Sequence, residues 1–248
     1  MNDNRTAKLC GWIMVLLALL VAGGCATMSR PTDKRDPLEP YNRAIFKFND
    51  TLDRAVLKPV AQGYKRYTPR AFNLAITNFF SNLDDVSAAV NDLLQLKVID
   101  AASDVGRIAI NTTLGFGGLF DISSRIGLRK HEEDLGQTLG YWGVPPGPFL
   151  ELPFFGPSTV RDAPTSTVGA YLEPLFYVVS TPASVGLYGT RLIDYRADLL
   201  STEATLNEVA LDRYIAIRNA YLDHREFLVH DGAPPPDQDL IKELEQLE

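Results

Sequence analysis

The sequence has few of the residues that most often carry chemistry in proteins. It contains two cysteines and three histidines among 248 residues. The zinc protease motif H-E-x-x-H is absent. No histidine stands beside a nucleophile motif, because Ser158 lies in GPST and not in G-x-S-x-G. These absences argue against hydrolase chemistry. We predict that the protein is not an enzyme and has no catalytic residues.

Two segments suggest a ligand at first sight, but neither has the pattern that the ligand requires. The glycines of NTTLGFGGLFD (residues 111–121) lack the G-x-G-x-x-G spacing and follow a helical pattern instead of a strand, so we expect no dinucleotide cofactor. Residues 131–134 (HEED) are adjacent, and on a helix only His131 and Asp134 would share a face. We therefore interpret this run as a solvated charged turn and predict no metal site.

Long apolar runs and positive charge are also lacking. No internal run reaches the length of about 20 residues that a helix needs to cross a bilayer. Lys and Arg number 24 against 31 Asp and Glu, which gives a net charge of −7. An acidic chain is a poor partner for nucleic acid and for anionic lipid headgroups. Any contact with a membrane would therefore depend on apolar surface or on an anchor.

The N-terminus resembles a secretory signal peptide. Two basic residues precede an apolar segment at residues 12–21, which is too short to span a membrane, and small residues follow it. We predict a signal peptide over residues 1–24, with cleavage after Gly24.

The residues around the predicted cleavage site look like a bacterial lipobox, LLVAGGC, although Ala22 stands where leucine is usual. We expect diacylglyceryl and N-acyl groups on Cys25, which would anchor a tether at residues 25–35. Ala26 follows the cysteine, which favours the outer membrane over retention at the inner membrane. Removal of Cys10 with the signal would leave no disulfide. The alternative is ordinary cleavage, which would leave a free cysteine.

Apolar residues recur at three- and four-residue spacing through much of the chain, the pattern of amphipathic helices in an all-α fold. Asp-Pro and Glu-Pro pairs at residues 36–40 are typical of a helix start, and Lys58-Pro59 should end that helix. Asp84 and Asp85 should begin a new helix after a break near Asn82. We predict helices over residues 40–58, 71–82, 86–96, 100–113, 184–200 and 206–228, and an acidic, flexible tail over residues 231–248.

The central stretch, residues 136–160, has an unusual composition. It contains five glycines, five prolines, five aromatics and one charged residue, Glu151. The Gly and Pro spacing excludes a continuous helix, and prolines that cannot donate to a ladder argue against a strand pair. Such apolar, irregular backbone is either a rigid buried connection or a segment that lines a cavity near lipid.

Six segments in order resemble the MlaA (VacJ) family of outer-membrane lipoproteins. The resemblance runs from about Asp36 to Leu228 and predicts one domain over residues 36–230. The segments are DPLEPYNRAIFKFND, NFFSNL, NDLLQ, GRIAINTTLGFGGLFD, EDLGQTLGYWGVPPGPFLELPFFGPSTVRD and YLEPLFYVVSTP.

The resemblance implies a ring-like assembly of short amphipathic helices in the periplasmic leaflet of the outer membrane, with the central stretch as a ridge or hairpin. Family members lie beside trimeric porins, and an amphipathic channel lets misplaced phospholipids leave the outer leaflet. The lipids pass to a soluble periplasmic carrier, MlaC, which maintains lipid asymmetry. The alternative is a structural porin-associated lipoprotein without transport activity.

By position in the family motifs, residues 41–49 should form the helix beside the channel and residues 139–155 its lining or ridge. Asn42, Arg43 and Asn49 are candidates for contact with lipid headgroups, with capping of the helix start as the alternative role of Asn42. The predicted lining residues are Phe46, Phe48, Asn49, Leu139, Tyr141, Trp142, Val144, Phe149, Leu150, Leu152, Phe154 and Phe155.

Overall fold

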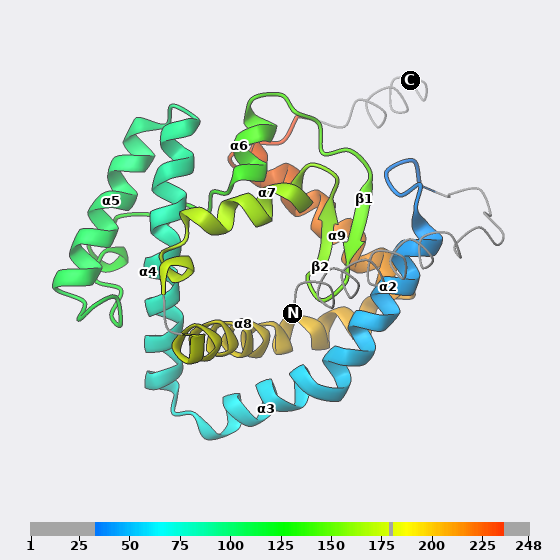
Figure 1. Ribbon diagram of the computed structural model, residues 1–248, viewed down its shortest axis with the longest axis horizontal. Helices are drawn as coiled ribbons and strands as arrows, with labels where there is room; N and C mark the ends of the chain where they lie inside the picture. The colour runs from blue at the N-terminus through cyan, green and yellow to red at the C-terminus, as the bar shows by residue number, and fades with distance from the viewer. Residues whose placement is uncertain (1–32, 179–180, 236–248) are drawn as a thin grey trace, which may run out of the picture.

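The computed structural model describes residues 33–178 and 181–235, so the predicted signal peptide, Cys25 and most of the tether and tail lie outside the described residues. Figure 1 shows the elements arranged around a central opening. Helices α3 (Lys58–Tyr67) and α8 (Thr181–Val209) lie along the bottom, α4 (Arg70–Leu94) on the left, and α7 (Asp162–Gly169) across the top. A β-hairpin and α2 (Glu39–Leu52) close the right-hand side. The predicted mainly helical, ring-like fold is confirmed.

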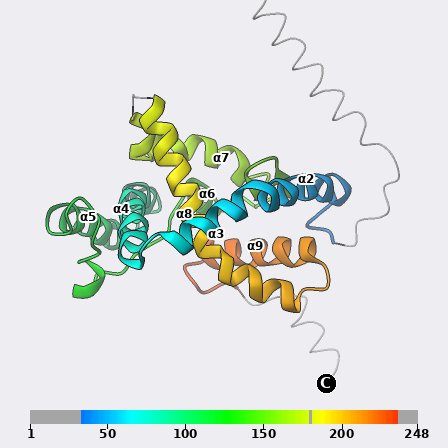
Figure 2. The same cartoon turned by 90° about the horizontal axis from the view of Figure 1, so that it is seen from below.

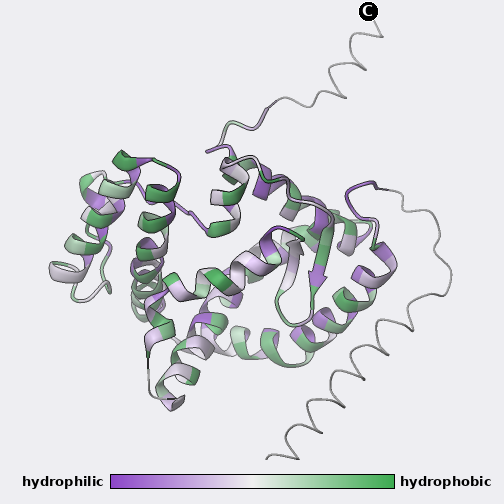
Figure 3. Cartoon of the chain, turned by 45° about the horizontal axis from the view of Figure 1, so that its top comes forward, coloured by the Kyte–Doolittle hydropathy of each residue, from purple (hydrophilic) through white to green (hydrophobic). Residues whose placement is uncertain are grey.

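Apolar and polar residues alternate along most of the helices (Figure 3). Within residues 33–178 and 181–235, none of the helices combines the length and the apolar character that crossing a membrane requires. The apolar face that the spacing predicts is clear in α2, α3 and α4 but weak in α8.

The first helical run is longer than predicted. It begins at Glu39 with Pro40 in its first turn, as expected, but continues through a π-helical turn, η1 (Asp53–Leu57), into α3. The predicted end at Lys58-Pro59 was wrong. Proline lacks an N–H and clashes with the carbonyl four residues before it, and the wide π turn relieves both problems just ahead of Pro59. The result is one curved run along the edge of the ring (Figure 2).

Helix α4 is also continuous where two helices were predicted. The two aspartates that resemble a helix start are used in tertiary contacts instead. Asp85 is fully buried and binds Arg107 at 3.1 Å and Lys130 at 2.7 Å, while Asp84 lies 2.7 Å from Arg191. Because their partners come from distant segments, the local pattern gave the wrong boundary.

Helix α5 (Val98–Thr113) packs along α4 and ends close to the predicted residue. Two glycines with positive φ, Gly117 and Gly118, reverse the chain after it. A Cβ on Gly118 would lie 2.8 Å from the Asn82 side chain, so the reversal needs glycine for close packing as well as for its backbone angle. The short 3-10 helix η2 (Ser124–Ile126) and helix α6 (Leu135–Tyr141) follow.

The central stretch contains a strand pair, which the count of prolines had argued against. Strands β1 (Phe149–Leu152) and β2 (Gly156–Thr159) pair antiparallel, with Phe149 opposite Thr159. Pro157 stands opposite Glu151, whose N–H points away from β2 and donates to Asn42. This is a position where the ladder requires no donor, so proline is tolerated. The other four prolines precede β1 or lie in the turn.

The C-terminal half is divided differently from the prediction. After α7 come two 3-10 helices, η3 (Ala170–Leu172) and η4 (Pro174–Tyr177), then α8 and α9 (Arg213–Val229). The break between α8 and α9 falls at residues 210–212 and not at 201–205. Asp212 caps α9 by accepting hydrogen bonds from the N–H groups of Tyr214 and Ile215. Leu206 and Val209 therefore belong to α8, and the predicted continuous stripe to Leu228 was wrong.

Candidate functional site

A cavity of about 930 Å³ opens inside the ring, bounded by α4, residues 130–134, α8 and α9. One side of it is apolar. Tyr188, Leu192 and Tyr195 recur along one face of α8 and are 41%, 53% and 64% exposed, respectively, and Phe80 and Ala88 face the cavity from α4. Together these residues form an exposed apolar face on α8 that can contact acyl chains or other apolar groups.

Much of the remaining lining of the cavity is charged. Arg191 binds both Asp84 and Glu173 at 2.7 Å, and burial raises the pKa of Asp84 to about 6. Arg225 binds Asp134 at 2.6 Å and Asp162 at 3.1 Å. The cavity is therefore amphipathic, with aromatic and aliphatic side chains interspersed with paired charges on α4 and α8.

Residues 131–134 are not the solvated turn that was predicted. Glu133 accepts hydrogen bonds from Gln95 at 2.7 Å and from Lys97 at 2.9 Å. Asp134 caps α6 by accepting from the N–H of Gln137 and also pairs with Arg225. The segment is held in the wall of the cavity by basic and amide side chains that only the folded chain brings to it.

Two asparagines of α2 cover the outer edge of the hairpin. The side-chain amide of Asn42 donates to the Phe149 carbonyl at 3.1 Å and accepts from the Glu151 N–H at 2.9 Å. Asn49 donates to the Leu152 carbonyl at 2.9 Å and accepts from the Phe154 N–H at 2.8 Å. The two asparagines are seven residues apart, so they lie on the same face of α2. Their amides bind the edge of β1, where a third strand would otherwise pair. Their amides are used by the hairpin, and contact of these side chains with lipid headgroups stays a prediction.

The structure separates the predicted channel residues into packed and exposed groups, and none of them lines the cavity of about 930 Å³. Phe149 is buried, with ring centroids 6.2 Å from both Tyr214 and Tyr221, and Phe46 packs on Tyr214 at 5.6 Å. Leu139, Leu150 and Leu152 are half-buried. The exposed predicted residues are Phe48, Tyr141, Trp142, Val144, Phe154 and Phe155. Contact of any of these residues with lipid stays a prediction.

The cavity-lining residues of α8 were not predicted as a site. Their only sequence signal is the spacing of Tyr188, Leu192 and Tyr195, which equally suits a helix face packed in a core. Next to this face, α8 is joined to α3 by hydrogen bonds from Tyr64 to Asp194 and from Lys65 to the Ala197 carbonyl.

Glu151 is a buried carboxylate on the hairpin whose burial raises its pKa to about 7 from 4.5. The folded chain therefore holds the proton where the unfolded chain releases it, and stability falls as pH rises from about 4.5 to about 7. Glu151→Gln keeps an acceptor for Asn49 and removes the charge. At pH 8 we expect the variant to be more stable by about 1 to 3 kcal/mol, and at pH 5 to match the wild type, as measured by denaturant unfolding.

The control for this prediction is the same substitution at Glu132, which is exposed. It should change the free energy of unfolding by less than about 0.5 kcal/mol at either pH. Equal stability of Glu151→Gln and wild type at pH 8 would show that burial does not penalise this carboxylate.

Comparison with known proteins gives consistent results. The model of the family described as MlaA lipoprotein matches residues 34–228. The intermembrane phospholipid transport system lipoprotein MlaA of Escherichia coli is 32% identical over 220 residues, covering 87% of each chain. Its namesake in Haemophilus influenzae is 31% identical over 246 residues, covering 94% of this chain and 98% of the relative.

Similarity extends to a solved structure and to a protein without an assigned role. An uncharacterized protein of Rickettsia felis is 38% identical over 192 residues, covering 77% of this chain and 76% of the relative. A structure solved in work on the structural basis for maintenance of bacterial outer membrane lipid asymmetry is 34% identical, with a TM-score of 0.69. It covers 78% of this chain and 98% of the solved chain.

Proposed function

Because the chain belongs to the MlaA lipoprotein family, we propose that it removes misplaced phospholipids from the outer leaflet of the outer membrane and passes them toward a periplasmic carrier. Its relatives are named for intermembrane phospholipid transport, and the similar solved structure comes from work on lipid asymmetry. Such a protein needs a passage for a molecule with apolar tails and a charged headgroup, and requires no catalysis.

The observation that carries this proposal is the amphipathic cavity inside the ring. Its volume of about 930 Å³ lies at the upper end of the usual range for small-molecule sites. The tails of a phospholipid would lie along Tyr188, Leu192 and Tyr195. The headgroup would lie among the charged side chains of the lining, where a phosphate would compete with carboxylates for Lys130 and Arg191.

The proposed position is in the periplasmic leaflet, held by lipid on Cys25. The exposed apolar side chains on and near the hairpin support this position, because Trp142, Phe154 and Phe155 would otherwise face water. The resemblance of the sequence to the family implies two further partners: a trimeric porin beside the ring, and the carrier MlaC on the periplasmic side. The anchor and both partners are proposals from the sequence resemblance.

The first test is to measure phospholipid in the outer leaflet of cells that lack the protein, by labelling surface-exposed aminophospholipid. We expect a clear rise that the intact gene reverses and Cys25→Ala does not, because an unanchored chain is lost from the membrane. Immunoblots of membrane fractions should show the variant released.

No rise in surface phospholipid on loss of the gene would contradict the transport function and would favour the structural porin-associated role. Full rescue by Cys25→Ala, with the variant still embedded in the outer membrane, would contradict the anchor alone.

A further inference from the structure

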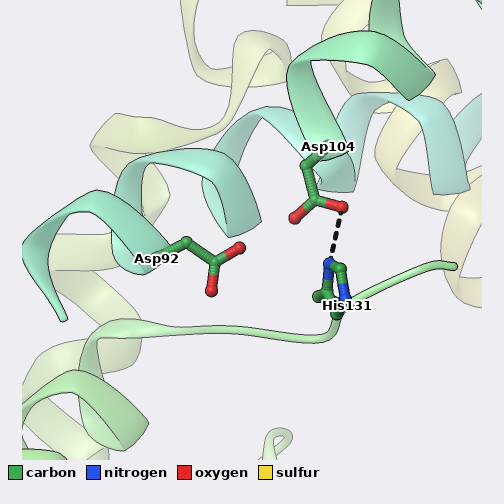
Figure 4. Close-up of side chains that lie close together, drawn as sticks. All are labelled: Asp92, Asp104 and His131. Atoms are coloured by element: carbon green, nitrogen blue, oxygen red, sulfur yellow. Dashed lines mark hydrogen bonds and ion pairs between the residues drawn. The ribbon is translucent and has the colours of Figure 1, made fainter. Parts of the chain in front are cut away.

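Three side chains that no sequence motif connects meet beside the cavity. Asp92 comes from α4, Asp104 from α5 and His131 from the segment between η2 and α6 (Figure 4). One ligand-type atom from each lies within 4.8 Å of the others. Asp92 and Asp104 are fully buried, and His131 is partly open to the cavity that it lines. The arrangement joins three separate segments at one point.

Within the described part of the chain, no lysine or arginine pairs with either aspartate of this cluster, and His131 contacts Asp104 alone of the two. Both carboxylate oxygens of Asp92 and Oδ2 of Asp104 are buried without a hydrogen-bond partner. The basic residues nearest in the fold are engaged elsewhere: Arg107 and Lys130 bind Asp85, and Lys97 binds Glu133 and Asp231. Buried carboxylates without a partner are strongly unfavourable while charged, so the cluster favours either a shared proton or a bound cation.

We propose that Asp92, Asp104 and His131 bind a zinc ion. Nδ1 of His131 lies 3.1 Å from Oδ1 of Asp104, close to the separation of about 3.3 Å between two ligands at the corners of a zinc tetrahedron with bonds near 2.0 Å. Zinc accepts both imidazole and carboxylate ligands, whereas magnesium and calcium favour oxygen alone.

The surroundings of the site suit this role. Oδ1 of Asp100 lies 3.6 Å from Nε2 of His131, on the side from which a carboxylate orients a metal-bound imidazole. The exposed edge of His131 faces the cavity, from which water can supply a fourth ligand. The ion would fasten α4, α5 and residues 130–134 together and so hold one wall of the cavity in place.

The test uses the full chain in detergent, stripped of metal with a chelator and titrated with zinc chloride alone. We expect about one tightly held zinc per chain after desalting, by elemental analysis. At a free zinc concentration 100 times the Kd, the midpoint of thermal unfolding should rise by about 5 to 10 °C. Asp92→Asn keeps the size of the side chain and removes a ligand charge, so it should weaken zinc binding by about 100-fold or more.

His224→Asn is the matched control, because His224 is an exposed histidine on α9 outside the cluster; it should bind zinc like the wild type. The proposal is overturned if the wild-type chain retains no zinc and its unfolding midpoint does not respond, as expected if the two carboxyls share a proton instead. It is also overturned if Asp92→Asn binds zinc as tightly as the wild type, or if His224→Asn abolishes binding.

Discussion

Cells that carry Leu192→Glu in place of the wild-type chain will accumulate phospholipid in the outer leaflet nearly as strongly as cells without the protein. Leu192 is 53% exposed on the cavity wall, between Tyr188 and Tyr195 on one face of α8. A carboxylate there must lose water when an acyl chain passes, and a penalty of about 3 kcal/mol lowers the rate about 100-fold. Labelling of surface aminophospholipid measures the effect.

Val185→Glu provides the matched control. Val185 lies on the same helix and is 68% exposed, but it does not line the cavity. Both variants add a charge at an exposed apolar position, so both should fold and reach the membrane at wild-type levels. Only Leu192→Glu should impair transport. Normal surface lipid with Leu192→Glu would show that phospholipid does not pass along this wall.

Replacement of Asp36 by alanine will reduce the free energy of unfolding by about 3 to 5 kcal/mol, the cost of leaving a buried ion without its partner. Asp36 is fully buried and accepts hydrogen bonds from Asn42 at 2.8 Å, from the Tyr214 hydroxyl and from Arg218 at 3.0 Å. Arg218 is itself buried, and without Asp36 it would retain only the partly exposed Asp33 as an anionic partner.

This effect exceeds that of an ordinary ion pair because the network closes the ring. It joins the segment before α2 to α9, residues about 180 positions apart in sequence. Asp36 also orients Asn42, which covers the edge of β1. Loss of Asp36 should therefore loosen the hairpin together with α9, and chemical denaturation in detergent will report it.

Asp223→Ala is the control for Asp36→Ala. Asp223 pairs with Arg35 at 3.5 Å across the same junction, but its side chain is 70% exposed. An exposed pair contributes less than about 1 kcal/mol, so this variant should unfold almost like the wild type. Similar losses for the two variants would show that burial of Asp36 adds nothing to its contribution.

The helices could be predicted from the sequence to the extent that local patterns control them. The apolar spacing of residues 100–113 predicted α5, and the proline pair at residues 36–40 predicted the start of α2. The order of family motifs predicted the ring. These features depend on residues a few positions apart. A helix places such residues on the same face whatever the rest of the protein does.

Wrong boundaries arose where a side chain has a choice between a local and a distant partner. Asp84 and Asp85 resemble a helix start, but they bind Arg191, Arg107 and Lys130. The prolines of the central stretch were counted without the register, and Pro157 lies where the hairpin needs no donor. The partners of the two aspartates are more than 20 residues away along the chain, whereas Pro157 is decided by its register opposite Glu151.

The sequence by itself determined which faces of the helices are apolar, where the chain must turn at glycine, and the family to which the chain belongs. The tertiary structure alone decided what those faces enclose. The open face of α8, the asparagines on the edge of β1 and the meeting of Asp92, Asp104 and His131 depend on how the ring closes. Closure depends on long-range packing and buried ion pairs, and no local periodicity encodes which distant groups will meet.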